Sequence, residues 1–367
     1  MTGALPVIYK KQRGKENSMK KIFTLLIVCA MIAGLTACGN SYSSSGASGS
    51  NGAAASASGE PVVIQIAYEN NPGEPIDLGC NEWARLIQER SNGTMTVELF
   101  PSSQLGSKTD LVDQMQMGQG IITIGDAAFW ADYGAKEMGI ASAPYIYDNW
   151  DQYFKLLKTD WWQEQVDQLV DNGLRIVSAN WAYGVRELMT TKPVRTLDDL
   201  SGMIIRTPNN VMQMKTWEEM GAAPTAMALG DVYTATQQGT IDGMENPLAT
   251  LYGQAYYEVA KYITMIDYIR MPIQWITSED WFESLTEEQQ QILCETGDEA
   301  GLFHNQKQDE MGDQYVSDMK ANGVEFIYPN DTELARFKDA ALKIYDNPDV
   351  TANWSAGLYD NIRGMIS

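Results

Sequence analysis

The first half of the chain after residue 60 alternates between short β-branched runs and longer segments with helical spacing of apolar residues. The runs VVIQIAY (62–68), MTVELF (95–100) and IITIGDA (121–127) predict three strands, because β-branched residues favour extended backbone. The segments 77–93 and 108–118 repeat apolar residues at helical intervals and end at glycine. Strands and helices in this alternation predict an α/β fold.

The second half continues the alternation with longer helical segments. Residues 150–173 have helical periodicity, and LRIVSANW (174–181) is expected to be extended. MIIRT (203–207) predicts another strand, and the helices predicted at 211–221 and 230–239 both end at glycine.

A capping-box sequence, Thr286-Glu-Glu-Gln289, opens an acidic helical stretch that extends to about residue 322. At 1.5 Å per residue this helix would be roughly 50 Å long, which is more than the width of one small domain. It is therefore expected either to lie along two domains or to break at Gly297 or Gly301.

The amino-terminal region carries the signals of an exported lipoprotein. Lys20 and Lys21 precede the apolar run 22–34, which is too short for a membrane span of about 20 residues. The ending Leu-Thr-Ala-Cys38 resembles a bacterial lipobox. We expect residues 1–37 to be leader and signal peptide, with Met19 as the start, and Cys38 to be lipidated. Residues 38–59, rich in Ser, Gly and Ala, predict a flexible tether. An ordinary signal peptide with an incidental cysteine is the alternative.

Charge and composition narrow the function. The chain of 367 residues has a formal net charge of −22, which disfavours nucleic acid or an anionic bilayer as a partner surface. It does not exclude an anionic ligand held by a buried arginine. His304 is the only histidine, and the sequence contains no HExxH, GxSxG, Walker or CxxC motif, so classical hydrolase and metalloenzyme functions are disfavoured and no metal or cofactor is expected. Cys80 and Cys294 either form a disulfide or remain two buried thiols.

A series of weak motifs, in collinear order, resembles a known family. The motifs are SNGTMTVELFPSSQLG (91–106), the helix 108–118, APYIYDN (143–149), Gly184-Val-Arg186, LDDLSGMIIRTPN (197–209), APTAMALGDVYTATQQGTIDGMENP (223–247) and DWFESLTEEQQQIL (280–293). Together they span nearly the whole chain after the tether. They resemble the DctP-type extracytoplasmic solute receptors of tripartite ATP-independent periplasmic (TRAP) transporters.

The resemblance implies an α/β, two-domain periplasmic-binding-protein clamshell with discontinuous domains. Mixed sheets would be flanked by helices, and a long helix would back both domains. Domain I would comprise 60–183 plus 272–311, and domain II 184–271 plus 312–367. A small organic acid would bind in the cleft between them, and the loaded receptor would deliver it to a TRAP permease without catalysis, ATP or a cofactor.

The resemblance also implies the residues that hold the acid. Arg206, at the end of MIIRT, matches the arginine that clamps the ligand carboxylate, and a guanidinium suits a carboxylate because it offers two parallel donors. Arg186 matches a second position that holds the acid, and Asn246 matches an amide that contacts the carboxylate. The alternatives are a surface ion pair for Arg206, a structural salt bridge for Arg186 and a turn cap for Asn246. Glu245 is expected to take no part.

Further candidates follow from matching positions or from their neighbours. Asp126 matches an acidic residue that reaches ligand hydroxyls, and Glu69 and Asn70 occupy the loop after the first strand. Leu229 matches an apolar position that packs on the ligand. Two aromatic residues that border Arg186 could form a wall of the pocket, although buried tryptophan more often belongs to a core; these are Trp181 and Tyr183.

These expectations combine into one predicted function. The chain would be a lipid-anchored, extracytoplasmic receptor that captures a sugar acid, such as a hexuronate, on the outer face of a Gram-positive cell or in a Gram-negative periplasm. Two alternatives are a surface lipoprotein enzyme acting on carbohydrate, with Glu69 and Asp126 as its carboxylate pair, and a ligand sensor that signals to a membrane kinase.

Overall fold

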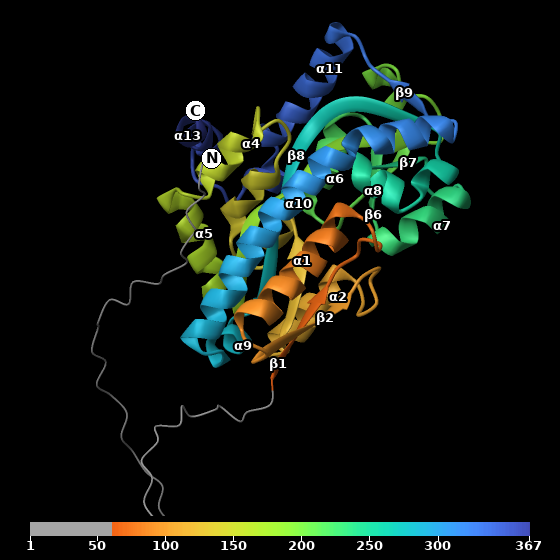
Figure 1. Ribbon diagram of the computed structural model, residues 1–367. Coiled ribbons are helices and arrows are strands. Elements are labelled where there is room, and N and C mark those ends of the chain that lie inside the picture. Colours follow the sequence, from red (N-terminus) through yellow and green to blue (C-terminus); the bar gives the residue numbers. More distant parts are fainter. Residues whose placement is uncertain (1–60) are drawn as a thin grey trace, which may run out of the picture. The chain divides into compact units, whose positions relative to one another are not determined.

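The computed structural model describes residues 61–367 (Figure 1). The predicted signal peptide, the lipidated Cys38 and the tether fall outside the described residues. None of the helices in the described part is both long and apolar enough to cross a membrane. The strands are β1 Val62–Ala67, β2 Met95–Phe100, β3 Ile121–Gly125, β4 Leu174–Thr190, β5 Ile204–Thr207, β6 Ala223–Ala226, β7 Gly243–Pro247, β8 Tyr262–Ser278 and β9 Glu325–Ile327. The α-helices are α1 Pro75–Arg90, α2 Lys108–Gln116, α3 Ala127–Ala131, α4 Trp150–Leu156, α5 Asp160–Asp171, α6 Val211–Glu219, α7 Val232–Gln237, α8 Leu248–Gly253, α9 Glu279–Ser284, α10 Glu287–Ala321, α11 Asp331–Leu342, α12 Pro348–Thr351 and α13 Leu358–Ile366.

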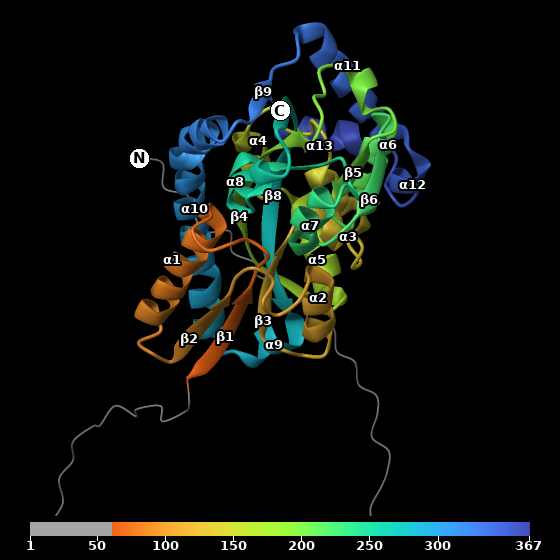
Figure 2. The same cartoon turned by 90° about the vertical axis from the view of Figure 1, so that its right-hand side faces the viewer.

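The strands form a mixed sheet in the order β2-β1-β3-β8-β4-β7-β5-β6, with β9 paired to β8. Strand β1 pairs in parallel with β2 and β3, and β5 pairs in parallel with β6 and β7. The long strands β4 and β8 are antiparallel to each other and run between these two parallel groups (Figure 2). The predicted α/β class, with mixed sheets flanked by helices, is confirmed.

Separate hydrophobic cores lie on the two sides of the β4–β8 ladder. One core contains Ile64, Trp83 and Trp275, and lies under β1, β3 and α1. Two others lie under β5 and β7, around Trp217 and around Met244. The β4 and β8 strands cross from one side to the other, so the described residues form two lobes that share these two strands.

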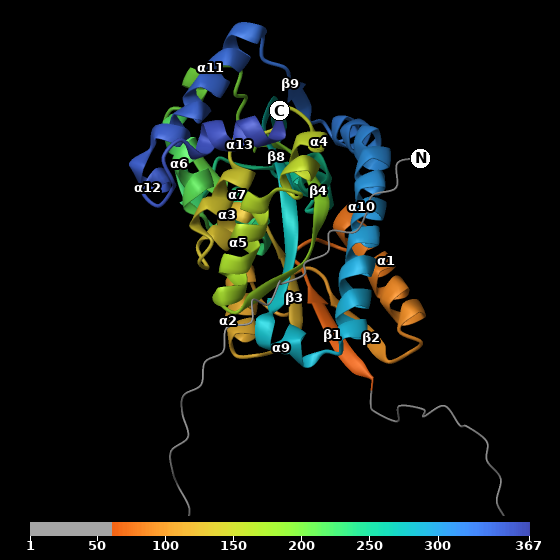
Figure 3. The ribbon, with the colours of Figure 1, turned by 90° about the vertical axis from the view of Figure 1, so that its left-hand side faces the viewer.

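Helix α10 extends for 35 residues and continues without a break through Gly297 and Gly301. It lies alongside α1 and β4 (Figure 3). A Cβ atom at Gly297 would lie 2.8 Å from the Trp83 ring, and one at Gly301 would lie 2.1 Å from Asn180 Oδ1. The glycines therefore permit the close approach of α10 to its neighbours, and the helix lies along both lobes.

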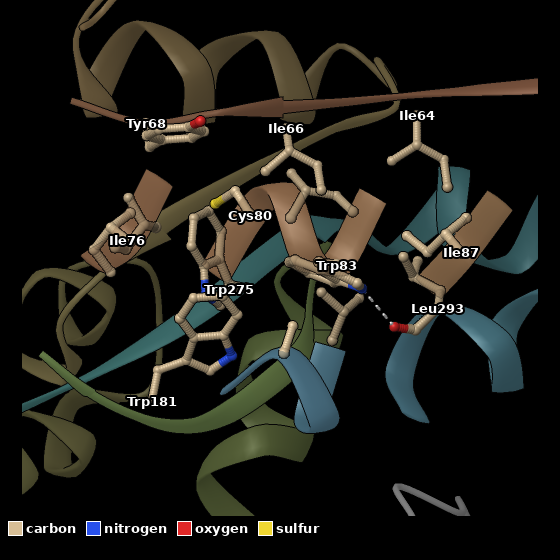
Figure 4. Packing of buried hydrophobic residues seen from close by; sticks show 14 of the residues in the cluster. Ile64, Ile66, Tyr68, Ile76, Cys80, Trp83, Ile87, Trp181, Trp275 and Leu293 are labelled. Carbon is tan, nitrogen blue, oxygen red and sulfur yellow. Dashed lines mark hydrogen bonds between the residues drawn. The ribbon is translucent and has the colours of Figure 1, made fainter. Parts of the chain in front are cut away.

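Three tryptophans form the centre of the first core (Figure 4). Trp83, Trp181 and Trp275 are each fully buried, with ring centroids 5.1 to 6.1 Å apart. The indole N–H of Trp83 donates to the carbonyl of Leu293 on α10 at 3.2 Å, which ties α1 to the long helix. Cys80 packs within this core and is a free thiol, as is Cys294, so the alternative of a disulfide between them does not hold in this structure.

Some predicted elements differ in extent. The helix predicted over 150–173 is two helices, α4 and α5, because Thr159 leaves the helix and caps α5 by accepting a hydrogen bond from the N–H of Trp162. Strand β4 extends to Thr190, well beyond the predicted 174–181. Strand β8 was not predicted: Pro272 interrupts its pattern, and it is accommodated where the ladder with β4 shifts register between Ala182 and Gly184.

Candidate ligand-binding site

A cavity lies where the two parallel groups of strands end. The residues that follow β1 and β3 face those at the ends of β5 and β7, and β4 and β8 contribute the floor. Crevices at the carboxyl ends of parallel strands are the usual ligand sites of α/β sheets. The lining residues are Glu69, Asn70, Lys108, Ile124, Gly125, Asp126, Tyr183, Arg186, Arg206, Pro208, Leu229, Asn246, Met271 and Ile273.

Arg206, on β5, is 3% exposed and faces the cavity. Its Nε donates to the carbonyl oxygen of Met227 at 2.9 Å, and Nη2 donates to the same oxygen. No carboxylate among the described residues forms an ion pair with it, and burial lowers its pKa. Arg206 therefore brings to the cavity a positive charge that no carboxylate of the described residues contacts directly, although the charges of Glu69 and Glu245 act on it through space.

Arg186, on β4, is held by Glu245 on β7. Its Nη2 donates to Glu245 Oε1 at 2.7 Å and to the Glu245 carbonyl at 2.9 Å, while Nε donates to Oε2. Burial favours a lower pKa for Arg186, but the charge and hydrogen bonds of Glu245 outweigh burial and raise it. The hydroxyl of Tyr268 also donates to Glu245. The expectation that Glu245 takes no part is wrong, because its fully buried carboxylate fixes the position of Arg186.

Asn246 follows Glu245 on β7, so the two side chains leave opposite faces of the strand. The side chain of Asn246 lines the cavity. The residue is only 2% exposed, yet its amide forms no hydrogen bond with any described residue. Its backbone is fixed in the β4–β7 ladder opposite Glu187. A buried amide with unused donors and acceptors, beside a cavity that Arg206 also lines, is equipped to bind a polar ligand.

Three polar residues line the cavity from the first lobe. Asp126 caps α3, and its Oδ1 accepts from the N–H groups of Ala128 at 3.0 Å and Phe129 at 3.1 Å. Its second oxygen has no hydrogen-bond partner among the described residues. Asn70 donates through Nδ2 to Tyr183 at 3.2 Å, which leaves its carbonyl oxygen as an acceptor. With Glu69, these side chains present acceptors for hydroxyl groups.

Lys108 lines the cavity but was not among the predicted site residues. Its Nζ lies 3.2 Å from Glu69 Oε2 and 5.5 Å from the centre of the Phe129 ring. Lys108 is the first residue of α2, where a cation opposes the helix dipole. That unfavourable placement is the sequence signal that could have identified it.

Of the apolar and aromatic candidates, two line the cavity and one does not. Leu229, in the short 3-10 helix Leu229–Asp231, lines the cavity, as does Tyr183, whose hydroxyl accepts from Thr250 at 2.8 Å. Burial raises the pKa of Tyr183 to about 12. Trp181 does not line the cavity: it is fully buried in the tryptophan core, and its indole N–H donates to the carbonyl of Gly297 at 3.1 Å.

The charges of the cavity are nearly balanced. Lys108 and Arg186 each have a protein carboxylate as partner, whereas Arg206 has none. The third carboxylate, Asp126, has no cation as partner, so Arg206 is the cation left to bind a ligand carboxylate while Asp126 is left to accept from ligand hydroxyls. In residues 61–367, no group of three or more His, Cys, Asp or Glu side chains could hold a metal ion.

Comparison with known proteins finds bacterial solute-binding proteins in sequence and in structure. The chain is 28% identical over 271 residues to the sialic acid-binding periplasmic protein SiaP of Vibrio cholerae, covering 72% of this chain and 82% of that protein. A TRAP periplasmic solute-binding protein of Ochrobacterium anthropi, solved with bound L-fuconate, is 42% identical with a TM-score of 0.80, covering 84% of this chain and all of that one. Another from Actinobacillus succinogenes, solved with bound L-galactonate, is 33% identical with a TM-score of 0.79, covering 83% and 99%.

The fold of these relatives is the two-domain clamshell that the sequence predicted, and both solved relatives are TRAP receptors. The model of the bacterial extracellular solute-binding proteins, family 7 (DctP), matches residues 66–349, which is most of the chain. The chain therefore belongs to the DctP family of bacterial extracellular solute-binding proteins, the receptors of TRAP transporters.

Proposed function

We propose that this protein is the lipid-anchored receptor of a TRAP uptake system and that it captures a sugar acid with one carboxylate, such as a hexonate or a hexuronate. The observation that carries the proposal is Arg206, which has no ion-pair partner among the described residues and is buried beside a cavity whose opposite side presents hydroxyl acceptors. Such a site needs one anionic group and several hydroxyls from its ligand.

The carboxylate of the ligand would bind Arg206, with Asn246 as a second donor and Arg186 as a third. Nε and Nη2 of Arg206 both donate to the carbonyl of Met227, whereas Nη1 forms no hydrogen bond with a described residue and is available to a ligand. Glu245 holds Arg186 rigidly, so this guanidinium is already in place before the ligand arrives. Preorganised donors of this kind lower the entropic cost of binding.

The hydroxyls of the ligand would bind the first lobe. Asp126, Asn70 and Glu69 each offer an oxygen to the cavity, and carboxylate and amide oxygens accept hydrogen bonds from hydroxyl groups. Leu229 would pack against the carbon chain. L-Fuconate and L-galactonate, the ligands of the two solved relatives, each combine one carboxylate with a chain of hydroxyls. These ligands support the same class for this chain.

The proposed domain boundaries locate a hinge between the two domains. With domain I as 60–183 plus 272–311, and domain II as 184–271 plus 312–367, the chain crosses between domains at Tyr183–Gly184, at Met271–Pro272 and, within α10, between residues 311 and 312. Gly184 and Met271 are paired in the β4–β8 ladder at a register shift, and Gly184 itself has a φ of +136°. A hinge at this point would open and close the cavity, and the ligand would stabilise the closed state.

Lipidation of Cys38 would hold the receptor at the outer surface of the cytoplasmic membrane, or of a membrane facing the periplasm, where the loaded form would meet the permease. The support for this step is the Lys-rich, apolar and Leu-Thr-Ala-Cys sequence before residue 39. The receptor is expected to bind and release its ligand without a chemical reaction.

A thermal-shift screen of hexonates, hexuronates and C4 dicarboxylates, followed by calorimetry, tests the proposal. A ligand that binds the folded state raises the unfolding temperature by mass action, and we expect this for at least one sugar acid with one carboxylate. Tight binding of a C4 dicarboxylate and of no sugar acid would overturn the proposal. Conversion of a carbohydrate substrate by the purified protein would instead support the enzyme alternative.

A further inference from the structure

Lys108 and Glu69 form an ion pair at the edge of the ligand cavity. Both residues also line an adjoining pocket that Phe129, Pro208 and Met227 help to form. A ligand that enters the cavity from this pocket therefore passes the pair. Nothing in the proposed contacts to the carboxylate or the hydroxyls requires a lysine here.

The pair is tightly enclosed. The side chain of Glu69 is 9% exposed and that of Lys108 is 21% exposed. Glu69 Oε2 contacts Lys108 Nζ at 3.2 Å, while Oε1 accepts a long hydrogen bond of 3.4 Å from the backbone N–H of Leu229. Each oxygen of Glu69 therefore has one protein partner and can still accept a hydrogen bond from a ligand hydroxyl, while the charge of Lys108 is neutralised by the protein before any ligand arrives.

We propose that the Glu69–Lys108 pair makes the site selective for acids with one carboxylate over the matching acids with two. The inference rests on the proposed function, because it assumes that a sugar acid binds in this cavity. Lys108 acts as a latent second cation, and Glu69 is the residue that keeps it unavailable.

Charge at the cavity gives the physical reason. A second ligand carboxylate near Lys108 would either displace Glu69 from its ion pair or lie next to its negative charge, with Asp126 also lining the cavity. Like charges in a poorly hydrated site repel strongly, and leaving a buried carboxylate unpaired is costly. Arg206 alone cannot compensate two carboxylates.

Glu69→Gln tests the role of the pair with little change in shape. Glutamine keeps a side-chain oxygen for the N–H of Leu229 but cannot neutralise Lys108. L-Galactonate and galactarate are matched probes, since galactarate carries a second carboxylate on the same kind of hydroxylated chain. The double variant with Lys108→Gln is the control, because it removes the cation that the single variant releases.

The measurement is the ratio of the two dissociation constants, by calorimetry, in the three proteins. We expect the wild-type protein to bind L-galactonate about tenfold or more tightly than galactarate. Glu69→Gln should reduce that preference by about tenfold, which is equivalent to roughly 1.4 kcal/mol. The double variant should lose the gain in galactarate binding. The ratio is used because a general loss of affinity affects both probes. Circular dichroism checks folding, and Glu69→Ala replaces Glu69→Gln if the latter does not fold.

Three results would overturn the inference while leaving the proposed function intact. They are equal binding of both acids by wild type, an unchanged ratio in Glu69→Gln, and a folded Glu69→Gln protein that binds neither acid, which would mean that the charge of Glu69 is required to bind any acid and does not select between them. If wild type binds no sugar acid at all in the screen, the proposed function is overturned and this inference with it.

Discussion

The tryptophan core and the ligand cavity are both buried, both border β4, and are built in opposite ways. In the core, Trp181 is fully buried, packs against Trp83 and Trp275, and uses its one donor on the backbone of α10. In the cavity, Arg206 and Asn246 are 3% and 2% exposed, yet they retain polar groups without protein partners.

The difference separates stability from recognition. Filling space with matched apolar groups stabilises the folded state, whereas a buried charge or amide without a partner costs free energy unless a ligand supplies the missing contacts. Substitutions in the core should therefore change the free energy of unfolding. Substitutions in the cavity should change ligand affinity with little loss of stability.

Trp83→Ala is expected to have the largest effect. It removes the ring that contacts Trp181 and Trp275 and the hydrogen bond to Leu293, and should lower the free energy of unfolding by about 4 kcal/mol. Urea unfolding followed by circular dichroism measures it. Trp83→Phe, which retains most of the ring, is the control and should lose less. A loss below about 1 kcal/mol in Trp83→Ala would contradict the role given to this core.

Arg206→Ala should produce the opposite result. Removing the cation that faces the cavity is expected to weaken binding of a sugar acid by about a hundredfold, or roughly 3 kcal/mol. The free energy of unfolding should change little, because the lost hydrogen bonds to the Met227 carbonyl are offset by removal of a buried charge that has no carboxylate in direct contact. Calorimetry and urea unfolding measure the two quantities.

Arg206→Lys serves as the matched control for charge. Lysine keeps the charge but lacks the planar fork, so its affinity should fall between those of wild type and Arg206→Ala. If Arg206→Ala unfolds as readily as Trp83→Ala, then Arg206 belongs to the stabilising part of the molecule and the comparison fails.

His304 should give the smallest effect, through pH. Its ring stacks on Trp181, its Nε2–H donates to the carbonyl of Ala182 at 3.1 Å, and burial lowers its pKa to about 4. The unfolded chain, with a histidine pKa of about 6.5, binds a proton more readily. Stability from this residue is therefore retained above pH 6.5 and lost as the pH falls toward 4, by about 2 kcal/mol between pH 7 and pH 5.

Comparing urea unfolding of wild type and His304→Gln at pH 7 and pH 5 isolates this contribution, since the acidic residues titrate in both proteins. The pH-dependent loss should be about 2 kcal/mol smaller in His304→Gln. Equal losses in the two proteins would show that the ring is hydrated enough to be protonated in the folded state.

Local sequence signals were sufficient for much of the fold. The β-branched run at 95–100 is β2 with the predicted bounds, and the capping box at Thr286 opens α10 as predicted. Such elements are written in neighbouring residues, through side-chain periodicity and local hydrogen bonds. The collinear motifs also placed Arg206 and Asn246 in positions that line the cavity, although their contacts with a ligand stay a prediction.

Tertiary structure decided which residues meet. Arg186 and Glu245 are 59 positions apart, so no local pattern could show that Glu245 holds the arginine. Trp181 and Tyr183 are both aromatic residues of β4, yet the first packs in the core and the second lines the cavity. Gly297 and Gly301 resemble helix breakers in sequence, but they allow α10 to approach Trp83 and Asn180. The sequence by itself determined the elements and their order, because these depend on short-range interactions. Only the folded chain determined the partners of each buried charge and ring, because those depend on contacts between distant segments.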